Sequence, residues 1–185
     1  MLSNLDKERI SEFTHELLNV IDDPEREGII ETPKRVAKMW DEFLSPEPFE
    51  FTTFRNESKG DDMIIEAGID FYSVCEHHLL PFFGTATVAY IPNDGIIVGI
   101  SKLARCVDFY SRRLQNQERI TRQIANRLKE ELMPKGVAVV LKARHLCQEM
   151  RGIKKTGAET ITSCMKGVFE HDMNARNEFL KLAKI

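Results

Sequence analysis

Apolar residues recur at helical spacing over the first 48 positions, which predicts two helices there. The first helix ends at Asp23-Pro24, and the second begins at Thr32-Pro33, a threonine typical of an N-cap before a proline typical of the first helical position. The segment Ser45-Pro46-Glu47-Pro48 ends the second helix and has the composition of a linker. We therefore predict an N-terminal helical region over residues 1–48. Its apolar positions are Ile10, Phe13, Leu17, Leu18 and Ile21, then Val36, Met39, Trp40 and Phe43.

Beyond residue 48 the apolar pattern changes to strand-like runs interrupted by further helices. Ser101 is typical of an N-cap for the first of these helices. The order of elements favours the α+β class, with an antiparallel sheet that carries a helix pair on one face. We assign residues 49–185 to this second domain. Strands are predicted at 63–74, 84–91, 96–100, 136–143 and 160–169, and helices from 101, at 117–133 and at 172–182.

The composition is that of an ordinary globular protein and argues against several classes of partner. The chain has 185 residues, 42% of them apolar and 30% charged, which suffices for one well-buried core. A formal net charge of −3 offers no positive excess for nucleic acid, and the longest apolar runs are too short to span a membrane. The N-terminus lacks a signal-peptide pattern, so we expect a cytoplasmic protein. Because thiols stay reduced there, its four cysteines indicate metal binding or catalysis rather than disulfides.

Two short clusters, Cys75-Glu76-His77-His78 and His145-Leu146-Cys147, hold the most informative side chains. Cysteine and histidine are the ligands that Zn²⁺ prefers, and three protein ligands with an open fourth position are typical of a catalytic zinc site. The alternative is a buried cysteine with solvated histidines, or two packed thiols. Cys106 and Cys164 have no such neighbours, so we predict that they are small buried hydrophobes.

The spacing within the clusters suggests how the side chains divide their roles. Cys75 and His78 stand three residues apart, which a tight turn can direct toward one ion. His77 would point away from His78 and toward a substrate. On a strand, His145 and Cys147 would share a face, so both could bind metal, or one could bind while the other transfers protons.

Basic side chains gather near the predicted start of a helix, in Ser101-Lys102-Leu103-Ala104-Arg105. A helix N-terminus favours anions, and arginine matches the geometry of a phosphate, so a polyphosphate ligand is one interpretation. A solvated, salt-bridged helix face is the other. The same two interpretations, a phosphate ligand or a solvated surface, apply to Arg112, Arg113 and Arg151. Glu118, in the polar stretch 115–119, could accept hydrogen bonds from a guanine edge. The alternative is a charge at a helix start that the helix dipole favours.

These motifs together resemble the GTP cyclohydrolase I family, in order and almost without gaps from about Thr32 to Phe169. The resemblance implies a tunnelling fold, in which each subunit contributes a four-stranded antiparallel sheet with two helices on one face, preceded here by the N-terminal helices. It also implies a homodecamer of two pentameric rings with sites at subunit interfaces. The motifs are Thr32–Met39, Cys75–His78 with Pro81-Phe82, Val88–Pro92, Gly99–Arg105, Gln115–Thr121, Gly136–Val140, His145–Cys147 and Arg151-Gly152.

Carried over by position, the resemblance assigns a role to each candidate residue. The zinc ligands would be Cys75, His78 and Cys147, and the acid–base pair would be His77 and His145. Glu118, helped by Gln117, would hold the guanine edge. The triphosphate would be held by Ser101, Lys102, Arg105 and Arg151, with Arg35 from a neighbouring subunit.

The reaction implied is hydrolysis of GTP to 7,8-dihydroneopterin triphosphate and formate, the first step of pterin and tetrahydrofolate biosynthesis. Two rival readings predict different observations. A reductase of a deazapurine nitrile would use a thiol nucleophile and a nicotinamide cofactor without zinc. A structural zinc module that binds RNA or protein would have a filled fourth coordination site and would release no formate.

Overall fold

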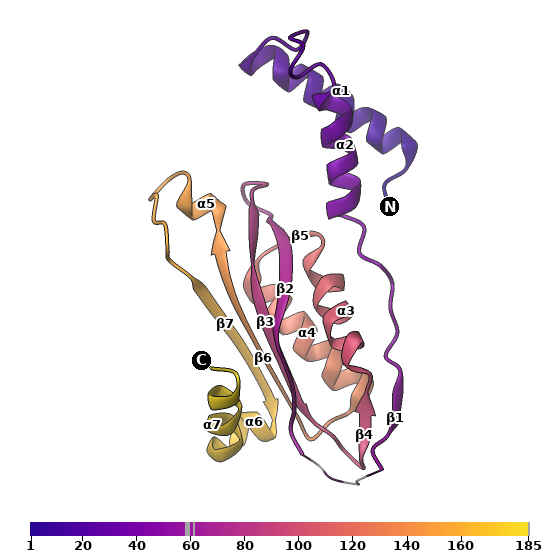
Figure 1. Ribbon diagram of the computed structural model, residues 1–185, viewed down its shortest axis with the longest axis vertical. Coiled ribbons are helices and arrows are strands. Elements are labelled where there is room, and N and C mark those ends of the chain that lie inside the picture. Colours follow the sequence, from indigo (N-terminus) through magenta and orange to yellow (C-terminus); the bar gives the residue numbers. More distant parts are fainter. Residues whose placement is uncertain (58–59, 61, 185) are drawn as a thin grey trace. The chain divides into compact units, whose positions relative to one another are not determined.

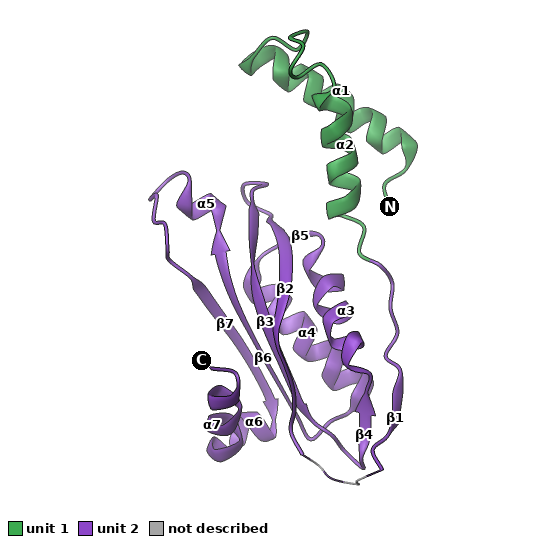
Figure 2. Ribbon diagram, viewed as in Figure 1, with its two compact units in different colours: residues 1–46 green, residues 47–185 purple. Residues whose placement is uncertain are grey.

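The computed structural model describes residues 1–57, 60 and 62–184, and the chain forms two compact units. Met1–Pro46 is the first unit and Glu47–Ile185 the second (Figure 2). Among the described residues, no helix is long and apolar enough to cross a membrane.

The first unit consists of α1 (Asn4–Ile21) and α2 (Thr32–Phe43). Ser3 caps α1 in a capping box, since its hydroxyl accepts from the Asp6 N–H while the Asp6 carboxylate accepts from the Ser3 N–H. The predicted N-cap at Thr32 is wrong by one position, because Glu31 precedes the helix and offers no side-chain cap. The Thr32 N–H already donates to the Ile29 carbonyl, so a turn rather than a threonine cap leads the chain into α2.

The second unit contains a five-stranded sheet in the order β5-β2-β3-β6-β7 (Figure 1). Each of the four long strands is antiparallel to the long strands beside it, and β5 is a two-residue strand that pairs in parallel with β2. The α+β class predicted from the sequence is confirmed. The strand predicted at 96–100 is β4, but β5, β1 and the pairing of β4 with β1 in a separate small sheet were not predicted. The strands are β1 (Thr53–Arg55), β2 (Ile64–Cys75), β3 (Pro81–Ile91), β4 (Ile96–Val98), β5 (Leu114–Gln115), β6 (Gly136–His145) and β7 (Thr160–Gly167).

Helices cover both faces of this sheet. α3 (Ile100–Ser111) and α4 (Gln117–Leu132) pack on one face, where alternate residues of β6 such as Val139 and Leu141 join the larger core. The intervening residues of β6 face a smaller core beneath α6 (Val168–His171) and α7 (Met173–Leu182). This alternation follows from the two-residue period of a strand.

Two predicted boundaries are corrected by local hydrogen bonds. Gly99, not Ser101, is the N-cap of α3, because its N–H donates to Thr52 O and the helix begins at Ile100. The last predicted strand ends at Gly167 rather than 169, where a φ of 62° turns the chain into α6.

The register of three strands brings distant segments together. Phe82, near the start of β3, lies opposite Ser73 of β2 on one side and His145 of β6 on the other. The end of β2, which carries Cys75, is therefore one strand away from the end of β6. The chain continues from β6 into the short helix α5 (Leu146–Glu149), which holds Cys147.

Gly84 tests how tightly β3 and β6 are paired. A Cβ atom at this position would overlap the Lys142 carbonyl oxygen and come within 2.7 Å of Ala143 Cα. Gly84→Ala is therefore expected to lower the free energy of unfolding by about 1–3 kcal/mol or more, because the strands must move apart. Urea unfolding followed by circular dichroism measures this change. Gly99→Ala is the matched control, since its Cβ would meet nothing closer than 3.8 Å; equal stabilities would contradict the close approach.

Candidate metal centre

Cys75, His78 and Cys147 lie together in the structure. Their ligand atoms are all within 4.8 Å of one another, and the Cys75 Sγ to His78 Nδ1 distance is 3.7 Å. Two ligands of one tetrahedral ion, each bound at about 2.0–2.3 Å, have a similar separation. In the part of the chain that the structure describes, this is the one such group of three ligands.

A tight turn after β2 directs the first two ligands. The Leu79 N–H donates to Cys75 O at 2.9 Å, and Leu79 itself has a positive φ of 54°. The Cys75 N–H in turn donates to Leu80 O at 2.9 Å, which closes the turn. Cys75 is buried while His78 is exposed, so the thiol is held by the fold and the imidazole lies at the mouth of the site.

His77 lies beside this group but outside it. Its ring is 65% exposed, and its Nδ1 is 3.8 Å from Cys75 Sγ. The rings of His77 and His78 are inclined by 69° with their centroids 6.2 Å apart. The rings are inclined to each other, but both histidines place Nδ1 within 3.8 Å of the Cys75 sulfur.

His145 is held by a buried glutamine. Its Nε2 is 2.8 Å from Gln117 Oε1, while Gln117 Nε2 donates to Leu141 O and Thr160 O at 3.0 Å each. Because both amide protons are used, Oε1 is the acceptor, and His145 carries its proton on Nε2 with Nδ1 left to accept. The Phe82 ring stacks on the imidazole at 4.5 Å. Burial lowers the pKa of His145, and the carboxylates of Glu118 and Glu149 oppose this shift.

The expectation that His145 and Cys147 share one face of a strand is wrong. β6 ends at His145, and Cys147 is the second residue of α5. Burial and the neighbouring Cys75 thiol raise the pKa of Cys147, with Arg151 acting in the opposite direction. The two residues nevertheless face one pocket of about 220 Å³. Its lining comprises Cys75, His77, His78, Phe82, Gln115, Asn116, Gln117, Glu118, His145, Cys147, Gln148 and Thr160.

Two arginine–carboxylate pairs flank the metal-ligand segments, and sequence reasoning missed both. Glu76 accepts from Arg119 at 2.6 and 2.9 Å, and Arg119 holds the pKa of this carboxyl below its ordinary value. Arg144 and Glu149, at 2.8 and 2.6 Å, bracket the turn that carries His145. Arg144 likewise lowers the pKa of Glu149. The signal was a carboxylate inside the first cluster and another two residues after the second, but the partner of each is set by the fold.

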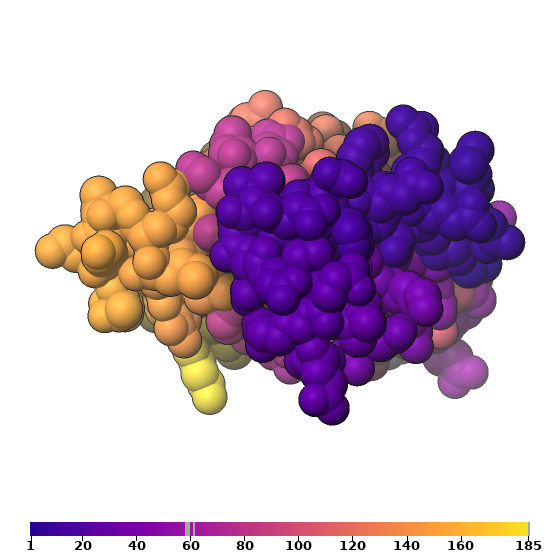
Figure 3. All heavy atoms as spheres, turned by 90° about the horizontal axis from the view of Figure 1, so that it is seen from above, coloured from indigo at the N-terminus to yellow at the C-terminus, as the bar shows by residue number. Residues whose placement is uncertain are grey.

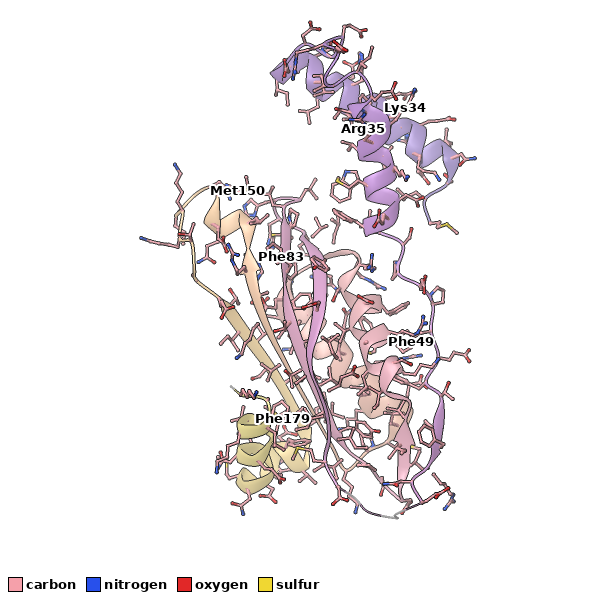
Figure 4. All side chains as sticks on the ribbon, in the orientation of Figure 1. Lys34, Arg35, Phe49, Phe83, Met150 and Phe179 are labelled. Atoms are coloured by element: carbon pink, nitrogen blue, oxygen red, sulfur yellow. The ribbon has the colours of Figure 1, made fainter. Side chains whose placement is uncertain are left out.

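Three of the predicted phosphate-binding residues lie elsewhere in the same unit as the metal-ligand group. Ser101, Lys102 and Arg105, in the first turns of α3, line a separate pocket of about 590 Å³ that shares no residue with the first. Figure 4 shows Phe49 of this pocket beside α3. The other end of α3 leads to β5, which pairs with the end of β2. A helix of 12 residues is about 18 Å long, so the metal ligands and the cationic pocket lie at opposite ends of α3.

The remaining cations differ in their surroundings. Arg151 is exposed in the segment after α5, which projects from the surface in Figure 3. Arg35 belongs to α2 in the first unit. Arg113 donates to Phe109 O at 2.7 Å and stacks over the Phe109 ring, and Arg112 approaches Asp108 at 3.9 Å. The last two arginines therefore interact within and beside their own helix.

The two cysteines without neighbouring histidines are packed in the core. Cys106 is fully buried, and burial raises its pKa to about 12, which confirms the prediction of a small buried hydrophobe. Cys164 is half-buried and packs against the same core.

Comparison with known proteins identifies the family. The family model described as GTP cyclohydrolase I matches residues 10–184. The chain belongs to the GTP cyclohydrolase I family. GTP cyclohydrolase 1 of Clostridioides difficile (strain 630) is 47% identical over 187 residues, covering 98% of each chain. That of Aquifex aeolicus (strain VF5) is 49% identical over 181 residues, and covers 97% of this chain and 98% of the relative. That of Geobacillus kaustophilus (strain HTA426) is 51% identical over 168 residues, or 88% of each.

The geometry of this GTP cyclohydrolase I family member predicts that Cys147 is needed for metal binding. Cys147→Ser is expected to lower bound zinc from about one ion per chain to well below it, because a thiolate is replaced by a weaker neutral ligand. Elemental analysis after dialysis against a zinc buffer measures the content. Cys164→Ser is the matched control and should keep its zinc; equal zinc in both variants would remove Cys147 from the ligand set.

Proposed function

We propose that this protein hydrolyses GTP to 7,8-dihydroneopterin triphosphate and formate, with Zn²⁺ held by Cys75, His78 and Cys147. The supporting observation is the convergence of these ligands with His145 and Glu118 on one pocket, in a chain of the GTP cyclohydrolase I family. The reaction would be the first step of pterin and tetrahydrofolate biosynthesis.

The donor set fits zinc. Two thiolates and one imidazole are soft to borderline ligands, which favour Zn²⁺ over Mg²⁺ or Ca²⁺. A zinc ion there would lower the pKa of bound water toward about 7, which supplies hydroxide at neutral pH. Within the described residues the group has three members, as a catalytic site with one position for water requires. This arrangement disfavours both a structural zinc module and a zinc-free nitrile reductase.

The protein's own residues handle the protons. The Nε2–H of His145 donates to Gln117 Oε1, so Nδ1 is the nitrogen that can exchange a proton with the purine. His77, largely exposed beside the ligands, is the second acid–base group. Either imidazole, once it has taken up a proton from the attacking water (at Nδ1 in the case of His145), can pass that proton to the ring nitrogen that leaves when the C8–N bond of guanine breaks. A second hydrolysis then releases formate.

Glu118 would hold the guanine edge. Its carboxylate lines the pocket in the first turn of α4 and can accept two N–H bonds from the pyrimidine part of the base. Gln117 has a different surrounding, since it is 1% exposed and its amide has three internal partners. We therefore assign Gln117 to the orientation of His145 rather than to a direct contact with the base.

The triphosphate would be held by the start of α3, through Ser101, Lys102 and Arg105, together with Arg151 and Arg35. The distance between the α3 pocket and the metal ligands of one chain supports a site shared between copies, in which the start of α3 from one subunit faces the metal centre of another. The sheet also supports assembly, because among the described residues β7 and most of β2 have no strand paired along their outer edge. Rings that pair such edges remove them, as in the homodecamer of tunnelling-fold subunits, each contributing four long strands.

The direct test is incubation of zinc-loaded protein with GTP. We expect stoichiometric formate release and a product that becomes a fluorescent pterin after oxidation, because the hydrolysis opens the imidazole ring and the product recloses as a pterin. A chelator should abolish both signals, and added zinc should restore them. GTP that remains intact with full zinc occupancy would contradict the proposed function.

A further inference from the structure

The carboxylate of Glu76 sits between the metal ligands in sequence but contacts a different element. It accepts three hydrogen bonds from the start of α4, two from the Arg119 guanidinium at 2.6 and 2.9 Å and one from Asn116 Nδ2 at 3.1 Å. The Glu76 N–H also donates to Gln115 O at 3.1 Å. Both the side chain and the backbone of Glu76 are therefore fixed to residues 115–119.

The partners of Glu76 are themselves constrained. Asn116 is the N-cap of α4, and its Oδ1 accepts from the Arg119 N–H at 2.8 Å. Gln115 is 1% exposed, accepts from Arg119 Nη1 at 3.2 Å, and donates to Tyr110 O at 2.9 Å. The Arg119 guanidinium thus joins the partly buried carboxylate of Glu76 to the buried amide of Gln115, and its two parallel N–H groups leave little freedom for either partner.

The position of this network distinguishes it from an ordinary surface ion pair. The side chains of Glu76 and Arg119 are 27% and 44% exposed, so the charge attraction itself is screened by solvent. The network joins two particular segments, because Glu76 directly follows the proposed zinc ligand Cys75 and Arg119 directly follows Glu118. The pair therefore links the metal-ligand turn to the helix start that faces the purine.

We infer that Glu76 and Arg119 are positioning residues, which fix the distance between the metal centre and the guanine-binding carboxylate of Glu118. The inference rests on the proposed function, in which C8 of the purine must meet a metal-bound hydroxide while Glu118 holds the opposite edge of the base. A small displacement of a reacting group costs much of the benefit of orientation. Neither residue lines the pocket, so the pair would act through the segments it joins and through His77, whose Nε2 lies 3.8 Å from the Glu76 carboxylate.

Variants of the pair separate charge from geometry. Glu76→Gln keeps the size of the side chain but loses the ion pair, and Arg119→Gln removes the guanidinium. Arg119→Lys keeps the positive charge but cannot form two parallel hydrogen bonds. The matched control is Arg127→Gln, which breaks the Arg127–Glu131 pair at 2.9 Å on the same helix, away from both pockets.

Two readouts on folded, zinc-saturated protein test the inference. We expect kcat/KM for GTP to fall at least about tenfold in all three pair variants, and the zinc dissociation constant, from competition with a chromophoric chelator, to rise about tenfold in Glu76→Gln. The Arg127→Gln control should stay within about twofold of the wild type. The double variant Glu76→Gln/Arg119→Gln should lose no more than the worse single variant, because both substitutions break one connection.

Several results would overturn the inference. These are wild-type kcat/KM and zinc affinity in the pair variants, losses matched by the Arg127→Gln control, full activity in Arg119→Lys, or additive losses in the double variant. A merely structural pair would lower the unfolding temperature and leave kcat/KM of the folded protein unchanged. If the wild type released no formate, the proposed function would fail by itself, and the zinc dissociation constants would still decide whether the pair positions the metal-ligand turn.

Discussion

The register of β3 against its two neighbours is the constraint on which the site depends. Phe82 pairs with Ser73 on one side and with His145 on the other, so β2 and β6 finish at the same end of the sheet. A slip of one residue would turn each side chain to the opposite face. Gly84, two residues further along β3, maintains the close approach because no Cβ fits between the strands there. Ligands some 70 positions apart in sequence thereby meet in space.

Polar contacts then hold the turn after β2 and the helix α5 after β6, which both leave this end of the sheet. Gln117 fixes the ring of His145, and the two arginine–carboxylate pairs fix the turns on either side of the proposed metal ion. Of these contacts, those of Gln117 and Glu149 are buried, whereas the Glu76–Arg119 pair is partly exposed, where a single ion pair contributes little to stability. Their value lies in geometry, since a catalytic site needs groups that do not have to reorganise during the reaction.

The sequence predicted the parts of the site that depend on residue type. Cysteine and histidine in two clusters indicated the three proposed metal ligands, which the structure brings together, and apolar periodicity located the four long strands and the helices α3 and α4 to within a few residues. It did not predict β5, because a two-residue strand has no periodicity, and it misplaced the N-caps of α2 and α3, because backbone turns and a hydrogen bond to Thr52 decide where those helices begin.

The sequence was least informative about which residues are neighbours in space. Ser101 and Arg105 are closer in sequence to the Cys75 cluster than Cys147 is, yet the structure puts them at the far end of α3 from it. Arg119 looked like one charge in a polar stretch, but it pairs with Glu76, 43 positions away in sequence. Both outcomes depend on the direction of a helix and on tertiary packing, which residue spacing does not encode.

Zinc X-ray absorption spectroscopy of the loaded protein tests the central claim most directly, since it reports the atoms bound to the metal. The structure predicts two sulfur ligands at about 2.3 Å and one imidazole nitrogen at about 2.0–2.1 Å, with the remaining position taken by a light atom from solvent. A single sulfur, or a shell completed by four protein ligands, would contradict an open metal centre built from Cys75, His78 and Cys147.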